Sequence, residues 1–549
     1  MIGGYVRRLR GASIVRLLGV LAFVWFAIVG LRLPVDVDEG YYALAAELVT
    51  HGRAPYADFF YPQGPHYPYL LAPFVLVVGA RFVALRLVSS AFAAVAASLV
   101  AHLVHRETRS KLAAVAAVGL FVTHELSWQW LVTIRPYGLG VAFLLGSLVL
   151  ATPPEREPRP RELVLAGALG VVAPLMRLPL APALGVAPLA LLLRGTSAGG
   201  RRGAAVLGLV VFGATSGWHP AACAIAASLG AVAVAAAGPG AVAALKRVGV
   251  YALGAALVAA PTALLFARSW ASFTYGLVGY HADSSSFVTF PQNRAYLSSV
   301  VGGGAFLELS ASGTQNALLL LANVVALTLP GASSRWAGLV GATALALGAA
   351  RHEPLIEHYL TPIVPYLAVG AGAALGHLDG RGLAPAARAR PAVVAAIAAI
   401  ALFALASSAS LEKKWIAGRH NGWDDRGFRP RALDEKAAAV ARATEARPGP
   451  LLATWPGSAL RSSERLMPGY ENHFTRLVAP KKTAEEAAAL HLTSDRDVRA
   501  EIERRAPRVV VLDREAGVGQ DRVAFERLVT GAGYVRIEAV GEVAVYARE

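Results

Sequence analysis

Charged residues are distributed very unevenly along this chain of 549 residues. Residues 1–410 contain only 28 Lys and Arg and 15 Asp and Glu, whereas the much shorter segment 411–549 contains 24 and 21. A water-soluble domain usually carries about one charged residue in four, so the long segment does not have the composition of one. The distribution predicts a membrane-embedded region at 1–410 and a water-soluble region at 411–549.

Apolar stretches recur throughout the first region. Residues 13–31 can form a helix that crosses the apolar core of a bilayer, which needs about 20 residues. Further stretches lie at 67–104, 112–128, 131–151, 163–177, 179–193, 204–218, 220–237, 249–267, 316–331, 335–350, 359–378 and 391–410. They predict a multi-pass α-helical membrane protein with about 12 to 13 transmembrane helices, in which 67–104 is either one span with a half-helix or two spans.

Basic residues near the first stretch set the expected orientation. Arg7, Arg8 and Arg10 precede it and Arg16 lies within it, which favours a cytoplasmic N-terminus and an uncleaved first span. The segment 32–66 then faces the outside of the plasma (inner) membrane. The net charge of +16 comes mainly from this membrane region, so we interpret it as topological and expect no nucleic-acid partner.

The segment 411–549 has a different pattern. Helix-like stretches such as ALDEKAAAVARATEA, TAEEAAALHL and DVRAEIERRA alternate with short β-branched runs such as PLLATW, RVVVLD, YVRIEAV and VAVYARE. This alternation predicts a small α/β domain. It contains no glycine loop for a nucleotide phosphate. The single cysteine, Cys223, excludes an intramolecular disulfide.

The segment 32–66 is unusually acidic. It holds five of the 15 acidic residues of the membrane region, namely Asp36, Asp38, Glu39, Glu47 and Asp58. The residues after Asp38 predict a short helix that ends at Gly52, and an N-terminal aspartate is a favoured helix cap. One cap does not account for five acids. We therefore predict a functional site here, with Asp38 beside Tyr41 and Tyr42.

Several motifs carry a resemblance to a known family. Asp-Glu-Gly-Tyr-Tyr at 38–42 is followed by Gly-x-x-Pro-Tyr-x-Asp-Phe at 52–59, Gly-Pro-x-Tyr at 64–67, Ala-Leu-Arg-Leu at 84–87 and His-Tyr-Leu-Thr-Pro at 358–362. The chain resembles GT-C membrane glycosyltransferases, and most closely the group of dolichyl-phosphate-mannose protein mannosyltransferases and lipid-A aminoarabinose transferases. The resemblance covers the order of elements through the whole chain, including a soluble C-terminal domain.

This resemblance implies a reaction. The family transfers a sugar, with inversion, from a polyprenyl-phosphate donor to a lipid, glycan or protein acceptor, and it implies Asp38 as the general base. It also implies an extracytoplasmic C-terminal domain. Relatives often have a second acid after the third or fourth span, where this chain reads Thr-Ile-Arg-Pro-Tyr at 133–137. The candidates for a second acid are therefore Asp58 and Glu125.

The departing polyprenyl phosphate needs cations. Arg86, Arg135 and Arg177 lie in or beside apolar stretches, where a charged residue is costly and marks a functional site, and His358 stands where relatives often have Arg. The expected substrate-contacting residues are Glu39, Tyr41, Tyr42, His66 and His281. His281 belongs to the long connection 268–315, which is either a functional lid or a disordered connector.

Metal binding and other functions stay open at this point. His352, Glu353, Glu357 and His358 come closest to metal-ligand spacing, and some family members use a divalent ion, but no cofactor is certain. The alternatives to an enzyme are a transporter or flippase of lipid-linked sugars and a non-catalytic membrane scaffold. Acids that gather in a loop, with no repeated halves, favour the enzyme.

Overall fold

The computed structural model describes residues 2–194, 241–285, 311–328, 357–380, 402–408, 411–412, 419–420, 423–513, 522–541 and 543–548. The apolar stretches predicted at 204–218, 220–237 and 335–350 lie outside these residues, as do His352 and Glu353, so the count of 12 to 13 spans stays a prediction. Four helices within the described ranges are long and apolar enough to cross a membrane: 13–32, 82–108, 242–264 and 358–376.

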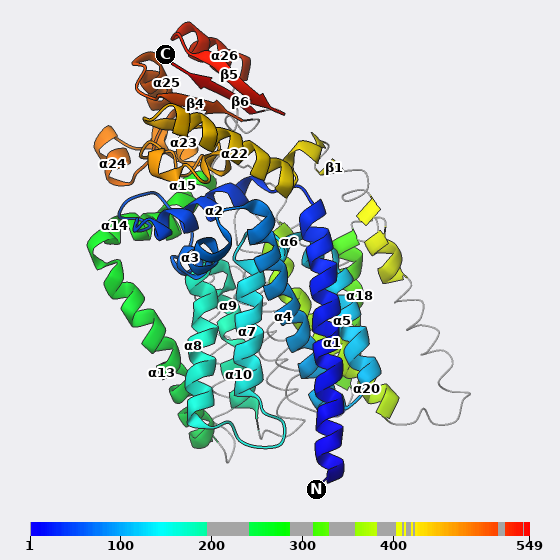
Figure 1. The fold of residues 1–549 in the computed structure, drawn as a ribbon. Coiled ribbons are helices and arrows are strands. Elements are labelled where there is room, and N and C mark those ends of the chain that lie inside the picture. The colour runs from blue at the N-terminus through cyan, green and yellow to red at the C-terminus, as the bar shows by residue number, and fades with distance from the viewer. Residues whose placement is uncertain are drawn as a thin grey trace.

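Long helices form a bundle whose axes run mostly side by side in Figure 1. They are α1 (Ile2–Arg32), α4 (Phe82–Thr108), α5 (Lys111–Thr123), α7 (Tyr137–Ala151), α8 (Pro160–Met176), α10 (Val186–Leu193), α13 (Ala241–Leu265), α18 (Ala311–Thr328) and α20 (Val364–Gly380). Helix α4 packs against α1, α5, α7 and α20, and α8 packs against α7 and α13. Small residues such as Ala93, Ala97 and Ala117 are fully buried there, which lets the helix backbones approach closely.

Shorter elements gather at the end of the bundle nearest the C-terminal region (Figure 1). They include α2 (Val37–Thr50), α3 (His66–Val78), α6 (Glu125–Trp130), α14 (Trp270–Thr274), the π-helical turn η3 (Tyr275–Gly279), α15 (Tyr280–Ser285) and the 3-10 helix η4 (Glu357–Ile363). The stretch 67–104 is thus two helices, α3 and α4, separated at Gly79, whose φ of 78° few other residues adopt. The described part of the connection 268–315 is largely helical, and its role as a lid stays a prediction.

The C-terminal region is a small α/β unit, as predicted. Its four-stranded sheet has the order β3 (Leu451–Ala453), β4 (Val509–Leu512), β6 (Val543–Ala547), β5 (Val535–Val540), with β3 parallel to β4 and the other pairs antiparallel. The described helices of at least six residues are α22 (Pro430–Ala446), α24 (Ala484–Ala489), α25 (Asp495–Glu503) and α26 (Arg522–Gly531). The chain is therefore a multi-pass α-helical membrane protein with a small C-terminal sheet.

The C-terminal region rests directly on the segment 32–66. Trp455 donates an indole hydrogen bond to the Val37 carbonyl at 2.9 Å, and its ring stacks on Phe82 with centroids 5.7 Å apart. Gly40 makes this approach possible, because a Cβ there would lie 2.7 Å from the Trp455 ring. One apolar core joins the two segments. The predicted domain boundary near residue 410 lies outside the described residues and stays a prediction.

Candidate active site

Helix α2 begins where its cap forms. Asp36 is the N-cap, and its carboxylate accepts the Asp38 N–H at 3.0 Å, while Glu39 accepts the Asp36 N–H at 2.8 Å. Each acid thus satisfies a backbone donor that the helix leaves unpaired. The short helix is confirmed, with Thr50 as its last residue. Asp36, and not Asp38, is the cap.

Glu39 and Arg86 form a fully buried ion pair beneath α2. The Arg86 guanidinium donates to both Glu39 oxygens at 2.6 Å and also to the carbonyls of Gly30 and Pro34. Glu39 accepts the Ile134 N–H as well, at 2.8 Å. All three guanidinium nitrogens of Arg86 are engaged. This pair joins α1, α2, α4 and the connection that precedes α7.

Asp38 lies beside a different arginine. Its Oδ2 is 2.9 Å from Nη2 of Arg135, and the same nitrogen donates to Asp36. The Asp38 side chain is only 18% exposed. Burial raises the pKa of Asp38 to about 6, and the neighbouring Asp36 and Glu39 act in the same direction, whereas Arg135 and Arg177 oppose it. A carboxylate with such a pKa can accept a proton near neutral pH.

Arg177 is a buried cation with no ion-pair partner in the part of the chain that the structure describes. It donates to the Tyr42 hydroxyl at 2.8 Å and lies over the rings of Tyr137 and Tyr359 at 4.8 and 5.2 Å. Its side chain comes from the end of α8, where the helix stops at Met176. A buried charge is costly unless a counter-charge meets it, so this position suits an anionic ligand.

His358 connects the two arginines. Its Nε2 lies 3.3 Å from Nη1 of Arg135 and 3.3 Å from Nη2 of Arg177. The Nε–H groups of both arginines are buried and have no hydrogen-bond partner among the residues that the structure describes. Buried donors are almost always paired in folded proteins. Two unpaired donors on neighbouring guanidinium groups indicate a site for an oxyanion.

Aromatic rings pack together around Tyr41 and Tyr42 of α2. The rings of Tyr41 and Tyr42 lie 4.3 Å apart, and Tyr42 meets Tyr67 edge-on at 5.3 Å. Tyr61 contacts both Tyr41 and Tyr42. Burial raises the pKa of Tyr42, so its hydroxyl stays protonated while it accepts the hydrogen bond of Arg177. These rings provide an apolar and hydrogen-bonding wall of the kind that ligand sites use.

The C-terminal region contributes to this wall. Phe474 meets Tyr41 edge-on, with ring centroids 6.3 Å apart. The next residue, His473, is 5% exposed, and neither of its ring nitrogens has a hydrogen-bond partner among the described residues. Burial lowers the pKa of His473 to about 3, an effect that Asp36 partly opposes. His473 is therefore a neutral histidine within electrostatic reach of the capping acid.

The remaining predicted site residues have other surroundings. Asp58 is exposed, and its carboxylate accepts the Ala54 N–H at 2.6 Å. Glu125 is buried at the start of α6, where its N–H donates to Gln315. Neither is among the charged groups with the largest effect on Asp38. The acid that shares Arg135 with Asp38 is Asp36, which was counted among the five acids of the segment 32–66 but not predicted as a site residue.

The two predicted loop histidines differ from each other. His66 lies at the start of α3, 3.3 Å from the Thr262 hydroxyl, and makes no described contact with Asp38. His281 donates to the Pro62 carbonyl at 3.0 Å, and its pKa is lowered to about 4 by burial and by Arg177. His281 therefore lies within electrostatic reach of Arg177 and acts as a neutral hydrogen-bond donor.

Three aromatic residues beside Arg135 and Arg177 were not predicted. They are Trp130, whose ring lies 5.1 Å from the Arg135 guanidinium, and Tyr137 and Tyr359, whose rings lie next to Arg177. Tyr359 immediately follows His358 in the late motif, and Tyr137 ends the Thr-Ile-Arg-Pro-Tyr run, so both stood beside noted residues. Trp130 carried no such signal.

No metal centre emerges from the part of the chain that the structure describes, in which no group of three or more His, Cys, Asp or Glu side chains is arranged to hold a metal ion. The paired acids Asp36 and Asp38 are bridged by Arg135, and this does not fit a shared cation.

Comparison with known proteins gives a fold. No family model matches the sequence. No curated protein matches it either. The crystal structure of ArnT from Cupriavidus metallidurans bound to undecaprenyl phosphate is similar with a TM-score of 0.60 at 14% identity, over 100% of this chain and 98% of that one. The apo structure of the same protein has a TM-score of 0.52, also at 14% identity, over 98% of both chains.

This similarity covers both regions of the chain, from the first span to the C-terminal sheet. The fold that the resemblance to GT-C glycosyltransferases implied is confirmed, because ArnT has that fold. The chain has the fold of a GT-C membrane glycosyltransferase.

Proposed function

We propose that this protein is an inverting glycosyltransferase that moves a sugar from a polyprenyl-phosphate donor to a hydroxyl group of a lipid, glycan or protein acceptor. The observation that carries the proposal is a half-buried carboxylate, Asp38, that pairs with the buried Arg135 and lies within electrostatic reach of Arg177, a second buried arginine that has no ion pair with any described residue. One group can accept a proton and the others can hold a phosphate. A solved relative of the same fold holds undecaprenyl phosphate.

In the proposed reaction, the acceptor oxygen attacks the anomeric carbon of the donor sugar. Asp38 takes the hydroxyl proton as the new carbon–oxygen bond forms. The bond from the anomeric carbon to the phosphate oxygen breaks, and its electron pair leaves with the polyprenyl phosphate. Arg135 and Arg177 stabilise that charge through donors that are aimed into the site before the reaction begins. No step uses a metal ion.

Arg86 has a different proposed role from the one predicted. Four of its five N–H groups donate to Glu39 and to two carbonyls, and its charge is already balanced by Glu39, so it is poorly suited to hold a phosphate. We assign it to positioning α2, and with it Asp38. The phosphate-binding set is then Arg135, Arg177 and His358, with Tyr42 as a hydrogen-bonding partner of Arg177.

The proposed orientation follows from the fold. The C-terminal region contacts α2, and the two chain ends lie at opposite ends of the molecule (Figure 1). If the basic N-terminus is cytoplasmic, the site and the C-terminal region both face the outside of the plasma membrane. Trp455 and Phe474 contact helix α2, and this supports the proposal that the C-terminal region faces the acceptor.

The test measures donor turnover. Purified protein in nanodiscs is given a panel of radiolabelled undecaprenyl-phosphate sugars with extracted membrane lipids as acceptors, and the release of undecaprenyl phosphate is followed. Asp38→Asn lowers the rate by about 10²–10⁴-fold, the usual contribution of a positioned general base. Asp58→Asn, an exposed acid of the same segment, is the matched control and leaves the rate unchanged.

Equal rates for Asp38→Asn and wild type would remove Asp38 as the base. Translocation of intact donor without release of undecaprenyl phosphate would instead favour the flippase alternative. Mass spectrometry of the labelled acceptor identifies the sugar and the acceptor.

A further inference from the structure

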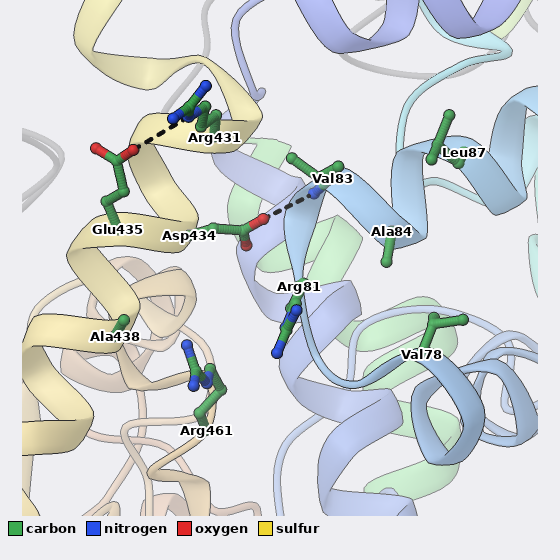
Figure 2. Close-up of a pocket in the computed structure, with 10 residues that line it drawn as sticks. All are labelled: Val78, Arg81, Val83, Ala84, Leu87, Arg431, Asp434, Glu435, Ala438 and Arg461. Carbon is green, nitrogen blue, oxygen red and sulfur yellow. Dashed lines mark hydrogen bonds and ion pairs between the residues drawn. The ribbon is translucent and has the colours of Figure 1, made fainter.

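A pocket lies on the surface between the start of α4 and the C-terminal region. Its volume is 540 Å³, and Figure 2 shows α4 and Val78 on one side and α22 with Arg461 on the other. We propose that this pocket binds the phosphate-bearing headgroup of an anionic phospholipid of the surrounding leaflet. The size falls within the range of small-molecule sites in proteins, about 300–1,000 Å³.

The charges in the pocket leave two arginines available. Asp434 accepts the N–H groups of Phe82 and Val83 at 2.6 and 3.1 Å, so it caps α4, and Arg431 pairs with Glu435 at 3.2 Å. Arg81 and Arg461 have no ion pair with any described residue. The lining contains three arginines and two acids and so carries one positive charge in excess, which matches the single negative charge of a phosphodiester.

Arg461 is held in place by its own backbone. Its φ of 69° is unusual for a residue with a side chain, and its N–H donates to both oxygens of the buried Glu47, at 2.9 and 3.1 Å. A strained conformation persists only where the surrounding contacts impose it. Figure 2 shows the Arg461 and Arg81 side chains on facing walls of the pocket. Two guanidinium groups are thus presented toward one space.

The rest of the lining is apolar and adjoins a helix that can cross a membrane. Val78, Val83, Ala84 and Leu87 form the wall on the side of α4, and α4 is long and apolar enough to cross the membrane from its first residue, Phe82. The end of α3 beside the pocket exposes Leu76 and Val77, at 72% and 83%. Exposed apolar side chains next to cations suit the boundary between headgroups and acyl chains.

The experiment measures lipid binding by native mass spectrometry. The full-length protein is released from micelles after incubation with phosphatidylglycerol, with phosphatidylcholine or with inorganic phosphate. Wild type retains one phosphatidylglycerol in preference to phosphatidylcholine. The double variant Arg81→Ala/Arg461→Ala binds it about tenfold or more weakly, because each arginine near a lipid surface contributes on the order of 1 kcal/mol. Arg442→Ala, an exposed arginine of α22 that pairs with Glu538, is the matched control and binds like wild type.

A second variant tests the apolar wall. Ala84→Phe fills the pocket and leaves both arginines in place, so it also weakens phosphatidylglycerol binding. Thermal unfolding midpoints show which variants are folded, and Arg81→Gln/Arg461→Gln replaces the double alanine variant if that one is not. Equal binding of phosphatidylglycerol by wild type, the double variant and Ala84→Phe overturns the proposal. Inorganic phosphate binding as tightly as the lipid overturns the assignment to a lipid.

Discussion

Two buried arginines, Arg86 and Arg177, contact helix α2 and differ in whether an acid pairs with them. Arg86 is fully buried, and each of its nitrogens donates to Glu39 or to a carbonyl. Arg177 is almost as buried, at 2% exposure. Among the described residues it contacts the Tyr42 hydroxyl, His358 and two aromatic rings, and its Nε–H has no hydrogen-bond partner there. The first is a completed ion pair and the second is an incomplete one.

The difference separates structure from function in a region where both residues looked alike in sequence. Removing one partner of a buried ion pair leaves an uncompensated charge, whereas a buried cation without a partner gains when an anion binds. Arg86 therefore stabilises the fold, and Arg177 is available to a ligand. The predictions below test this contrast.

The largest effect is expected for the completed pair. Arg86→Met destabilises the protein by about 3–5 kcal/mol, because Glu39 remains buried without its counter-charge. The free energy of unfolding of the purified protein measures this. Adding Glu39→Gln to the variant recovers part of the loss, and Arg109→Met, which breaks an exposed ion pair with Glu155, changes little. If Arg86→Met is as stable as wild type, the pair does not hold α2.

Arg177→Met should show the reverse pattern. It weakens binding of undecaprenyl phosphate by about 1.5–3 kcal/mol, the value of a hydrogen bond to a charged group, and leaves stability unchanged or slightly higher. Binding is measured by titration of the lipid into protein in nanodiscs, with Arg109→Met again as the control. A large loss of stability with unchanged lipid binding would show that Arg177 belongs with Arg86.

The pH dependence of turnover sharpens the role of Asp38. Only its carboxylate form can accept a proton, and burial raises its pKa to about 6. The rate is therefore constant above about pH 7 and falls by about tenfold per unit well below pH 6, where Asp38 is protonated. Arg135→Met removes an opposing positive charge and moves the profile to higher pH. A flat profile from pH 4.5 to 8 would contradict this role.

Glu47, at the far end of α2, should give the smallest effect. Burial raises its pKa to about 7, so the folded protein holds a proton that the unfolded chain has already lost. Stability contributed by the protonated form is present at low pH and decreases as the pH rises from about 4.5 through 7. Glu47→Gln should therefore equal wild type in stability at pH 5 and exceed it at pH 8.

Thermal unfolding at the two pH values measures that difference. A Glu47→Gln variant that is less stable than wild type at pH 8 would mean that the ionised carboxylate is needed to hold Arg461.

Local patterns were sufficient for much of the fold. In the C-terminal region, the alternation of helix-like and β-branched stretches predicted α22, α24, α25 and the four strands of the main sheet. In the segment 32–66, the acid-rich start predicted α2. These predictions succeed because a cap, a helix period or a strand run involves residues that are neighbours in the chain.

The candidate site was predicted less completely. Asp38, Arg135, Arg177 and His358 were predicted and do lie together, but their roles stay proposals. Asp36 was counted among the acids of the segment 32–66 but not predicted as a site residue, although its carboxylate reaches Arg135 across 99 residues of sequence. His473 was not among the predicted site residues and is buried within electrostatic reach of Asp36. Contacts between such distant segments leave no periodic trace in a single sequence.

The sequence by itself determined that this chain has a membrane region and a soluble region, because apolar length and charge density decide which solvent a segment can occupy. It also determined where helix α2 starts, since the capping acids are local. Only the tertiary structure decided which arginine is paired and which is unpaired, because that depends on which groups folding buries side by side. That distinction, made by helices α4 and α8 meeting α2, is what defines the candidate site.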